Sequence, residues 1–229
     1  MTFIVSTKTE RHGFLVPVCY ATQSGGTTID RDSQGGNPFA TALIELSSAS
    51  DVKITDFSRR LRELTAKLSH GHQHPEWVGD EPNVDWRLPN PVMGPRNRRV
   101  ALVLIVSDYG ALGSTSLDGA AWDELRVSSM LARNGFSVTQ GVGSSRKQLL
   151  AALKMFGEVS RQSDMAIVYS TGHGREAKGN VYLVPGDYPI ANGFAEEELI
   201  RSAIDVARLS EVCSARIMNL VFFAGCRTT

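Results

Sequence analysis

The sequence predicts an α/β fold in which helices flank a mostly parallel, doubly wound sheet. Three apolar runs in the second half of the chain are continuous rather than alternating, which is typical of strands buried on both faces: residues 99–107, 165–171 and 217–223. Segments of helical length separate these runs. An alternation of strand and helix favours right-handed crossovers and therefore a doubly wound sheet.

The helices between these strands are predicted from apolar spacing and from end signals. Residues 122–134 carry apolar side chains at helical spacing and stop before Gly135, where a left-handed cap fits. Residues 145–161 and 196–212 show a similar pattern. The second of these segments opens with three glutamates, and negative charge is favoured at a helix N-terminus.

The first part of the chain predicts one strand followed by two helices. Residues 14–22 form an apolar run, after which the chain becomes polar and rich in glycine. A helix over 38–47 has proline at an early position, and a helix over 55–68 places Phe57 and three leucines along one face. The first part can therefore add a strand and two covering helices to the same α/β domain.

A proline-rich segment at residues 89–98 is the predicted linker. It separates residues 1–88 from residues 99–229. With 229 residues and 42% apolar content, the chain is long enough for one substantial core, so we expect a single domain over residues 1–229.

Composition excludes several classes of function. The 24 basic and 24 acidic residues balance and do not cluster, so neither a nucleic-acid nor a lipid partner is expected. The longest apolar run, residues 100–106, is too short for a membrane helix, and the N-terminus lacks a secretion signal. Three widely spaced cysteines favour free thiols in a reducing cytoplasm.

A histidine and a cysteine follow two of the predicted strands. Because ligands collect at the carboxyl ends of parallel strands, His173 and Cys226 are expected at the same edge of the sheet. An imidazole can generate a nucleophilic thiolate, and backbone N–H groups can stabilise the resulting oxyanion. Glycines beside both residues are expected to let a substrate backbone approach. The alternative is that Cys226 is a small buried residue and His173 a surface or core residue.

Residues 98–229 resemble the large-subunit half of the caspase-like cysteine proteases, the group of caspases, metacaspases, paracaspases and their bacterial relatives. The resemblance rests on phrases in the family's order: Arg99-Val-Ala-Leu-Val-Leu-Ile, Ala121-Trp-Asp-Glu-Leu, Leu131-Ala-Arg-Asn-Gly-Phe-Ser-Val, Ile167-Val-Tyr-Ser-Thr-Gly-His-Gly, Asn180-Val-Tyr-Leu-Val-Pro-Gly-Asp and Leu220-Val-Phe-Phe-Ala-Gly-Cys-Arg. His173 precedes Cys226 by 53 residues, close to the roughly 50 in caspases. The resemblance implies a His173/Cys226 dyad, with an oxyanion hole formed by the N–H groups of Gly174 and Cys226.

Residues 1–88 resemble the small-subunit half of the same family, which implies a circularly permuted order. The matching phrases are Val18-Cys-Tyr-Ala-Thr, Gly25-Gly, Asp30, Gly36-Asn-Pro-Phe-Ala-Thr-Ala-Leu, Phe57-Ser-Arg-Arg-Leu and Gln73-His-Pro-Glu-Trp. The strand at 14–22 is therefore expected to pair with the strand at 217–223. The alternative is a strand-exchanged dimer in which each first half completes its partner's sheet.

The resemblance also implies a preference for basic substrates. Asp30 and Asp123 fall on positions that supply acids to the pocket of metacaspases and paracaspases, so cleavage after Arg or Lys is expected. Family members with this preference commonly have an aspartate two residues before the nucleophile, and Ala224 stands there instead. The alternative places Asp123 on an exposed helix face and Asp30 in a turn.

The expected function is that of a cytoplasmic cysteine endopeptidase of bacterial type, acting on protein or peptide substrates as a monomer. The chemistry requires no cofactor or metal, and calcium dependence cannot be judged from the scattered acids. Arg227 follows the nucleophile directly, so it is a candidate substrate or occupant of the cleft. The rival hypothesis, from another class, is a caspase-like scaffold with an idle dyad that acts as a binding or regulatory module.

Overall fold

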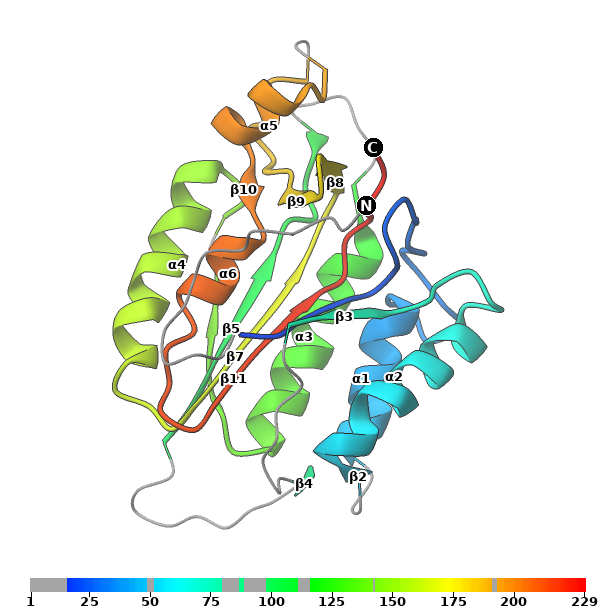
Figure 1. The fold of residues 1–229 in the computed structure, drawn as a ribbon, viewed down its shortest axis with the longest axis vertical. Helices are drawn as coiled ribbons and strands as arrows, with labels where there is room; N and C mark the ends of the chain where they lie inside the picture. Colours follow the sequence, from blue (N-terminus) through cyan, green and yellow to red (C-terminus); the bar gives the residue numbers. More distant parts are fainter. Residues whose placement is uncertain are drawn as a thin grey trace, which may run out of the picture.

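The centre of the computed structural model is a six-stranded sheet in the order β3-β1-β11-β7-β5-β6 (Figure 1). The structure describes residues 16–48, 52–79, 87–88, 98–110, 116–141, 143–190 and 193–229. The strands of this sheet are β1 (Val18–Tyr20), β3 (Glu76–Val78), β5 (Arg99–Ile105), β6 (Ser137–Gln140), β7 (Met165–Thr171) and β11 (Met218–Phe223). All neighbouring pairs are parallel except β1 with β3. The predicted mostly parallel sheet is therefore confirmed.

Two smaller sheets and six helices complete the described structure. Strands β8 (Gly174–Ala177), β9 (Asn180–Leu183) and β10 (Ile204–Asp205) form one small sheet, and β2 (Val52–Lys53) and β4 (Arg87–Leu88) form the other. The helices are α1 (Pro38–Ser48), α2 (Ile54–Leu68), α3 (Asp118–Arg133), α4 (Arg146–Ser160), α5 (Glu196–Ser202) and α6 (Ala207–Glu211). The predicted linker at 89–98 lies outside the described residues except for Arg98.

Helices cover both faces of the central sheet, as expected of a doubly wound arrangement (Figure 1). Side chains of α1, α2 and α3 pack with one set of alternate strand residues, and those of α4, α5 and α6 pack with the other set. Strands β5 and β7 are buried along their whole length, which explains their continuous apolar sequences. No described helix is both long and apolar enough to cross a lipid bilayer.

The first strand of the described residues, β1, pairs with the last, β11. Val18 lies opposite Val221 and Tyr20 lies opposite Phe223, in parallel register. The predicted pairing of these two distant segments is confirmed, and it is formed within one chain. The sheet of the second half is thus extended by β1 and then by β3.

The two halves also share one core. The ring of Phe222 on β11 lies 6.2–6.3 Å, centroid to centroid, from the rings of three residues of the first half: Phe39, Phe57 and Trp77. Tilted and edge-on ring contacts of this kind add to the gain from burying apolar area. Each half therefore depends on the other to cover its apolar surface.

The predicted helix ends are partly confirmed and partly wrong. Ser145 accepts the N–H of Gln148 and the Gln148 side chain accepts that of Ser145, which fixes the start of α4 where it was expected. The single helix predicted over 196–212 is wrong, because Ile204–Asp205 leaves the helical path to pair with β9. The tertiary pairing with β9 overrides a local pattern that is compatible with a helix.

Candidate active site

The loops that carry His173 and Cys226 lie side by side. Strands β7 and β11 are parallel neighbours, with Ser170 opposite Phe223, so the residues that follow them meet at the same edge of the sheet. The N–H of Ala224 donates to the carbonyl oxygen of Ser170 at 2.8 Å, which continues the pairing beyond the strand. The predicted placement of both residues at the carboxyl edge is confirmed.

The glycines in these loops allow the two loops to pack against each other. A Cβ at Gly174 would lie 2.0 Å from the carbonyl oxygen of Cys226, and a Cβ at Gly225 would lie 2.8 Å from that of Gly172. Gly172 itself has a φ of 155°, and a Cβ there would lie 2.8 Å from the Tyr109 hydroxyl. The close packing of the two loops therefore requires glycine at these positions, and the approach of a substrate backbone to them stays a prediction.

Tyr109 positions the backbone of His173. The tyrosine hydroxyl accepts the N–H of His173 at 2.8 Å and donates to the carbonyl oxygen of Val184 at 2.9 Å. The two rings lie 4.4 Å apart between centroids. Tyr109 is fully buried, and this burial raises the pKa of its hydroxyl, so the neutral phenol is kept. Sequence reasoning missed Tyr109, because its only signal is its position after the end of β5.

Cys226 is the only one of the three cysteines that is not buried. Its sulfur accepts the backbone N–H of Thr28 at 3.3 Å and lies 3.4 Å from the Thr28 hydroxyl. Cys19 and Cys213 are buried, and burial raises the pKa of the Cys213 thiol, as expected of a packing residue. Thr28 was also missed, because it is one of several threonines in a polar loop and nothing local distinguishes it.

Arg227 turns away from the edge of the sheet and into the protein. Its Nε donates to Glu176 at 3.0 Å, and its Nη1 forms an ion pair with Glu76. The guanidinium also lies 4.4 Å from the ring centroid of Tyr20. The Arg227 side chain is 8% exposed, so the hypothesis that this side chain occupies the cleft is wrong.

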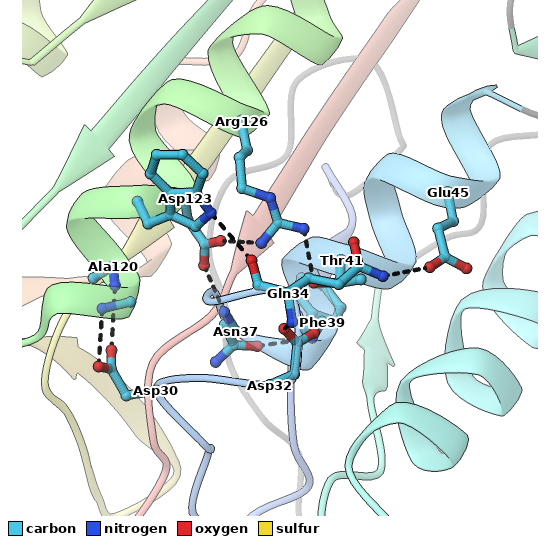
Figure 2. Close-up of polar contacts among 12 residues, drawn as sticks. Asp30, Asp32, Gln34, Asn37, Phe39, Thr41, Glu45, Ala120, Asp123 and Arg126 are labelled. Atoms are coloured by element: carbon cyan, nitrogen blue, oxygen red, sulfur yellow. Dashed lines mark hydrogen bonds and ion pairs between the residues drawn. The ribbon is translucent and has the colours of Figure 1, made fainter.

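Asp30 caps α3 from the first half of the chain (Figure 2). Its carboxylate accepts the N–H of Gly119 at 2.9 Å and that of Ala120 at 3.2 Å. Leu117, the residue that precedes the helix, provides no side-chain cap. A carboxylate at a helix N-terminus satisfies orphan N–H groups and interacts favourably with the helix dipole. Asp30 therefore has a structural role, because it joins the first half of the chain to a helix of the second half.

Replacing Asp30 by alanine is expected to lower the free energy of unfolding by about 1 kcal/mol, the typical cost of losing a helix cap. Urea unfolding at neutral pH measures the change. Asp118→Ala is the matched control, since that side chain is 72% exposed and accepts no α3 N–H among the described contacts. An Asp30→Ala protein as stable as the parent would contradict the capping role.

Asp123 is fully buried against the first half (Figure 2). Its carboxylate accepts the N–H of Asn37 at 3.0 Å and pairs with Arg126 at 3.3 Å. Burial raises its pKa to about 7, the hydrogen bond and Arg126 oppose the rise, and the charges of Asp32 and Asp30 add to it. The structure thus brings Asp30 and Asp123 close enough to interact, but only Asp30 reaches the surface.

No group of three or more histidine, cysteine or acidic side chains is placed to hold a metal ion within the part of the chain that the structure describes. The Nε2 atom of His72 lies 2.8 Å from the Thr27 hydroxyl, so this histidine is hydrogen-bonded to the loop that contains Thr28. The histidines around it therefore show no shared ligand geometry in this part of the structure.

The doubly wound sheet, with His173 and Cys226 on adjoining loops at its carboxyl edge, defines an α/β protein with a candidate site at that edge. The family comparison makes this specific, because residues 98–227, more than half of the chain, match the caspase domain of the peptidase C14 family. The chain belongs to the caspase-domain family of cysteine peptidases. No curated protein matches it.

Proposed function

We propose that the chain is a cysteine endopeptidase in which Cys226 is the nucleophile and His173 is its proton partner. The thiolate attacks the substrate carbonyl, the C–S bond forms, and the carbonyl electron pair moves to oxygen. The N–H groups of Gly174 and Cys226 are the proposed oxyanion donors. The intermediate collapses, the C–N bond breaks, and His173 gives the leaving amine the proton that it took from the thiol. Water then attacks the thioester, the C–S bond breaks, and the acid product leaves while Cys226 is restored.

The observation that carries this proposal is the contact between the two loops in a chain of the caspase-domain family. The backbones of Gly174 and Cys226 touch, so the residue after His173 and the nucleophile lie within one small region. The hydrogen bond that the backbone N–H of His173 donates to the Tyr109 hydroxyl supports a fixed position for this loop. Preorganised groups are what acyl transfer requires.

A preference for Arg or Lys before the cleaved bond is part of the proposal. Around the start of α3, the described ion pairs set three carboxylates, those of Asp30, Asp118 and Asp123, against the two guanidiniums of Arg31 and Arg126. A fourth carboxylate, Asp32, lies close enough for its charge to raise the pKa of Asp123. Asp30 lies two residues beyond Thr28, so its Cα is within about 7 Å of the residue that contacts Cys226. In the proposal Asp30 meets the substrate cation, and buried Asp123 adds its charge only where pH is high enough to ionise it, since burial raises its pKa to about 7.

The order of the two halves is proposed to be permuted, within one domain over residues 1–229. The parallel pairing of β1 with β11 supports this, because it joins strands from opposite ends of the chain. Residues 1–88 are the proposed small-subunit half, residues 89–98 the linker and residues 99–229 the large-subunit half.

The test is turnover of matched fluorogenic peptides that end in Arg, Lys or Asp, with and without calcium. We expect cleavage after Arg or Lys that disappears in Cys226→Ala and persists in Cys213→Ala, a control at a buried thiol. Asp30→Asn should reduce turnover of the Arg peptide more than that of an uncharged peptide. Cleavage after Asp would keep the dyad and overturn the acidic preference.

The second candidate function is a binding module with an idle dyad. Its supporting observation is Thr28, which already occupies hydrogen-bonding positions on the Cys226 sulfur. No turnover of any peptide under either calcium condition would favour this function over catalysis.

A further inference from the structure

The loop of the first half that contacts Cys226 is held from several directions. The N–H of Gly25 donates to the carbonyl oxygen of Arg227 at 3.0 Å, and the N–H of Arg227 donates to that of Gly26 at 2.9 Å. On the other side of Thr28, the N–H of Ile29 donates to the side-chain oxygen of Gln73 at 3.0 Å, and Gln73 is fully buried. Thr28 is therefore held by hydrogen bonds on both sides of it in the sequence. Those on the N-terminal side are made with Arg227, the residue after Cys226.

We propose that Thr28 is a further catalytic residue, which stabilises the thiolate of Cys226 through its backbone N–H and its hydroxyl. This inference rests on the proposed function, in which Cys226 attacks as thiolate. The two contacts to sulfur measure 3.3 Å from the N–H nitrogen and 3.4 Å from the hydroxyl oxygen. Sulfur accepts hydrogen bonds weakly as a thiol and more strongly when it carries charge.

The two donors act differently on the two forms of Cys226. The N–H of Thr28 can only donate, so its bond strengthens when the sulfur becomes negative. The hydroxyl can accept from the thiol and then rotate to donate to the thiolate. The proton that leaves sulfur passes to His173, so no other reactant is needed. Both contacts therefore favour ionisation of the nucleophile.

Thr28 belongs to the part of the chain that the caspase-domain match does not cover, since that match begins at residue 98. The reactivity of the nucleophile thus depends on the first half of the chain as well as the second. A chain in which the loop at 25–29 is displaced would keep Cys226 but lose these two donors.

The test is the rate at which iodoacetamide alkylates Cys226 in the full chain, measured from pH 5 to pH 10 by intact mass. Cys19 and Cys213 are buried, and Cys226→Ala gives the background. Thr28→Val removes the hydroxyl with little change in shape. Gln73→Leu releases the N–H side of the loop through Ile29. Thr28→Ser, which keeps both donors, and Thr27→Val, one residue away, are the matched controls.

We expect Thr28→Val and Gln73→Leu each to lower the alkylation rate at pH 7 by about fivefold, the effect of one lost hydrogen bond. The rates should converge toward pH 10, because the thiolate is the form that reacts and alkali favours it in every variant, and the two controls should stay within about twofold of the parent. If the alkylation rate falls in only one variant, the result supports the hydrogen bond that this variant removes and overturns the role of the other hydrogen bond. Thermal unfolding confirms that each variant is folded.

Unchanged alkylation rates in both variants would overturn the role of Thr28. Faster alkylation in either variant would also overturn it, because it would mean that Thr28 shields the thiol from the reagent instead of activating it. Alkylation needs no turnover, so the two proposals fail separately. Slower alkylation without peptide cleavage would keep Thr28 as a thiolate donor and reject the peptidase. Peptide cleavage with unaltered alkylation would reject Thr28 alone.

Discussion

Arg227→Ala is expected to lower the free energy of unfolding by about 3–5 kcal/mol, because it leaves a buried carboxylate without its partner. The Glu176 side chain is 9% exposed and receives the Nε–H of Arg227 at 3.0 Å. The same substitution removes the contact with Glu76 and the stacking on Tyr20, which come from the other half of the chain. Arg227 thus joins the two halves directly beside Cys226.

Urea unfolding at pH 7 measures this cost. Arg59→Ala is the matched control, since Arg59 and its partner Glu63 are both more than half exposed and an exposed ion pair contributes little. The double variant Arg227→Met with Glu176→Gln should recover much of the loss, because it removes both buried charges together. Equal stabilities of Arg227→Ala and Arg59→Ala would show that the Arg227 cluster does not join the halves.

The stability that Asp123 contributes is expected to fall as pH rises from 4 to 7, by an amount on the order of 4 kcal/mol. Burial raises its pKa to about 7 from the model-compound value of 3.8. Across that window the folded protein holds a proton that the unfolded chain releases, so the contribution is fully present below pH 4 and is lost as pH passes 7. The carboxyl lies between α1 and α3, where the halves meet.

Urea unfolding of the parent and of Asp123→Asn, at several values between pH 4 and pH 8, isolates this contribution from those of other groups. Asn resembles the protonated acid, so the two proteins should be similar near pH 4, and the variant should become relatively more stable as pH rises. Asp118→Asn serves as the control, because its side chain is 72% exposed and its charge is not among those that shift the pKa of Asp123. A constant difference between parent and Asp123→Asn would contradict the raised pKa.

Local sequence was sufficient to predict a strand or helix where burial left a continuous or periodic pattern of apolar residues. Strand β7 was predicted with the bounds Met165–Thr171, because a strand buried on both faces needs an unbroken apolar run. Helix α4 was predicted from its apolar spacing to within one residue at each end, and the structure shows a capping box of Ser145 and Gln148 at its start. The helix predicted over 196–212 failed, since the pairing of Ile204 with Leu183 is a contact that no local pattern records.

The distant pairing of β1 with β11 was predicted from family phrases and not from periodicity, since an apolar run does not specify its partner. Residue patterns were enough for the α/β class, four of the six strands of the central sheet, four helices, and the edge of the sheet where His173 and Cys226 lie. Only the tertiary structure decided what surrounds them. Thr28, Tyr109 and Glu176 come from separate segments, and contacts between segments depend on how the chain packs rather than on local residue type.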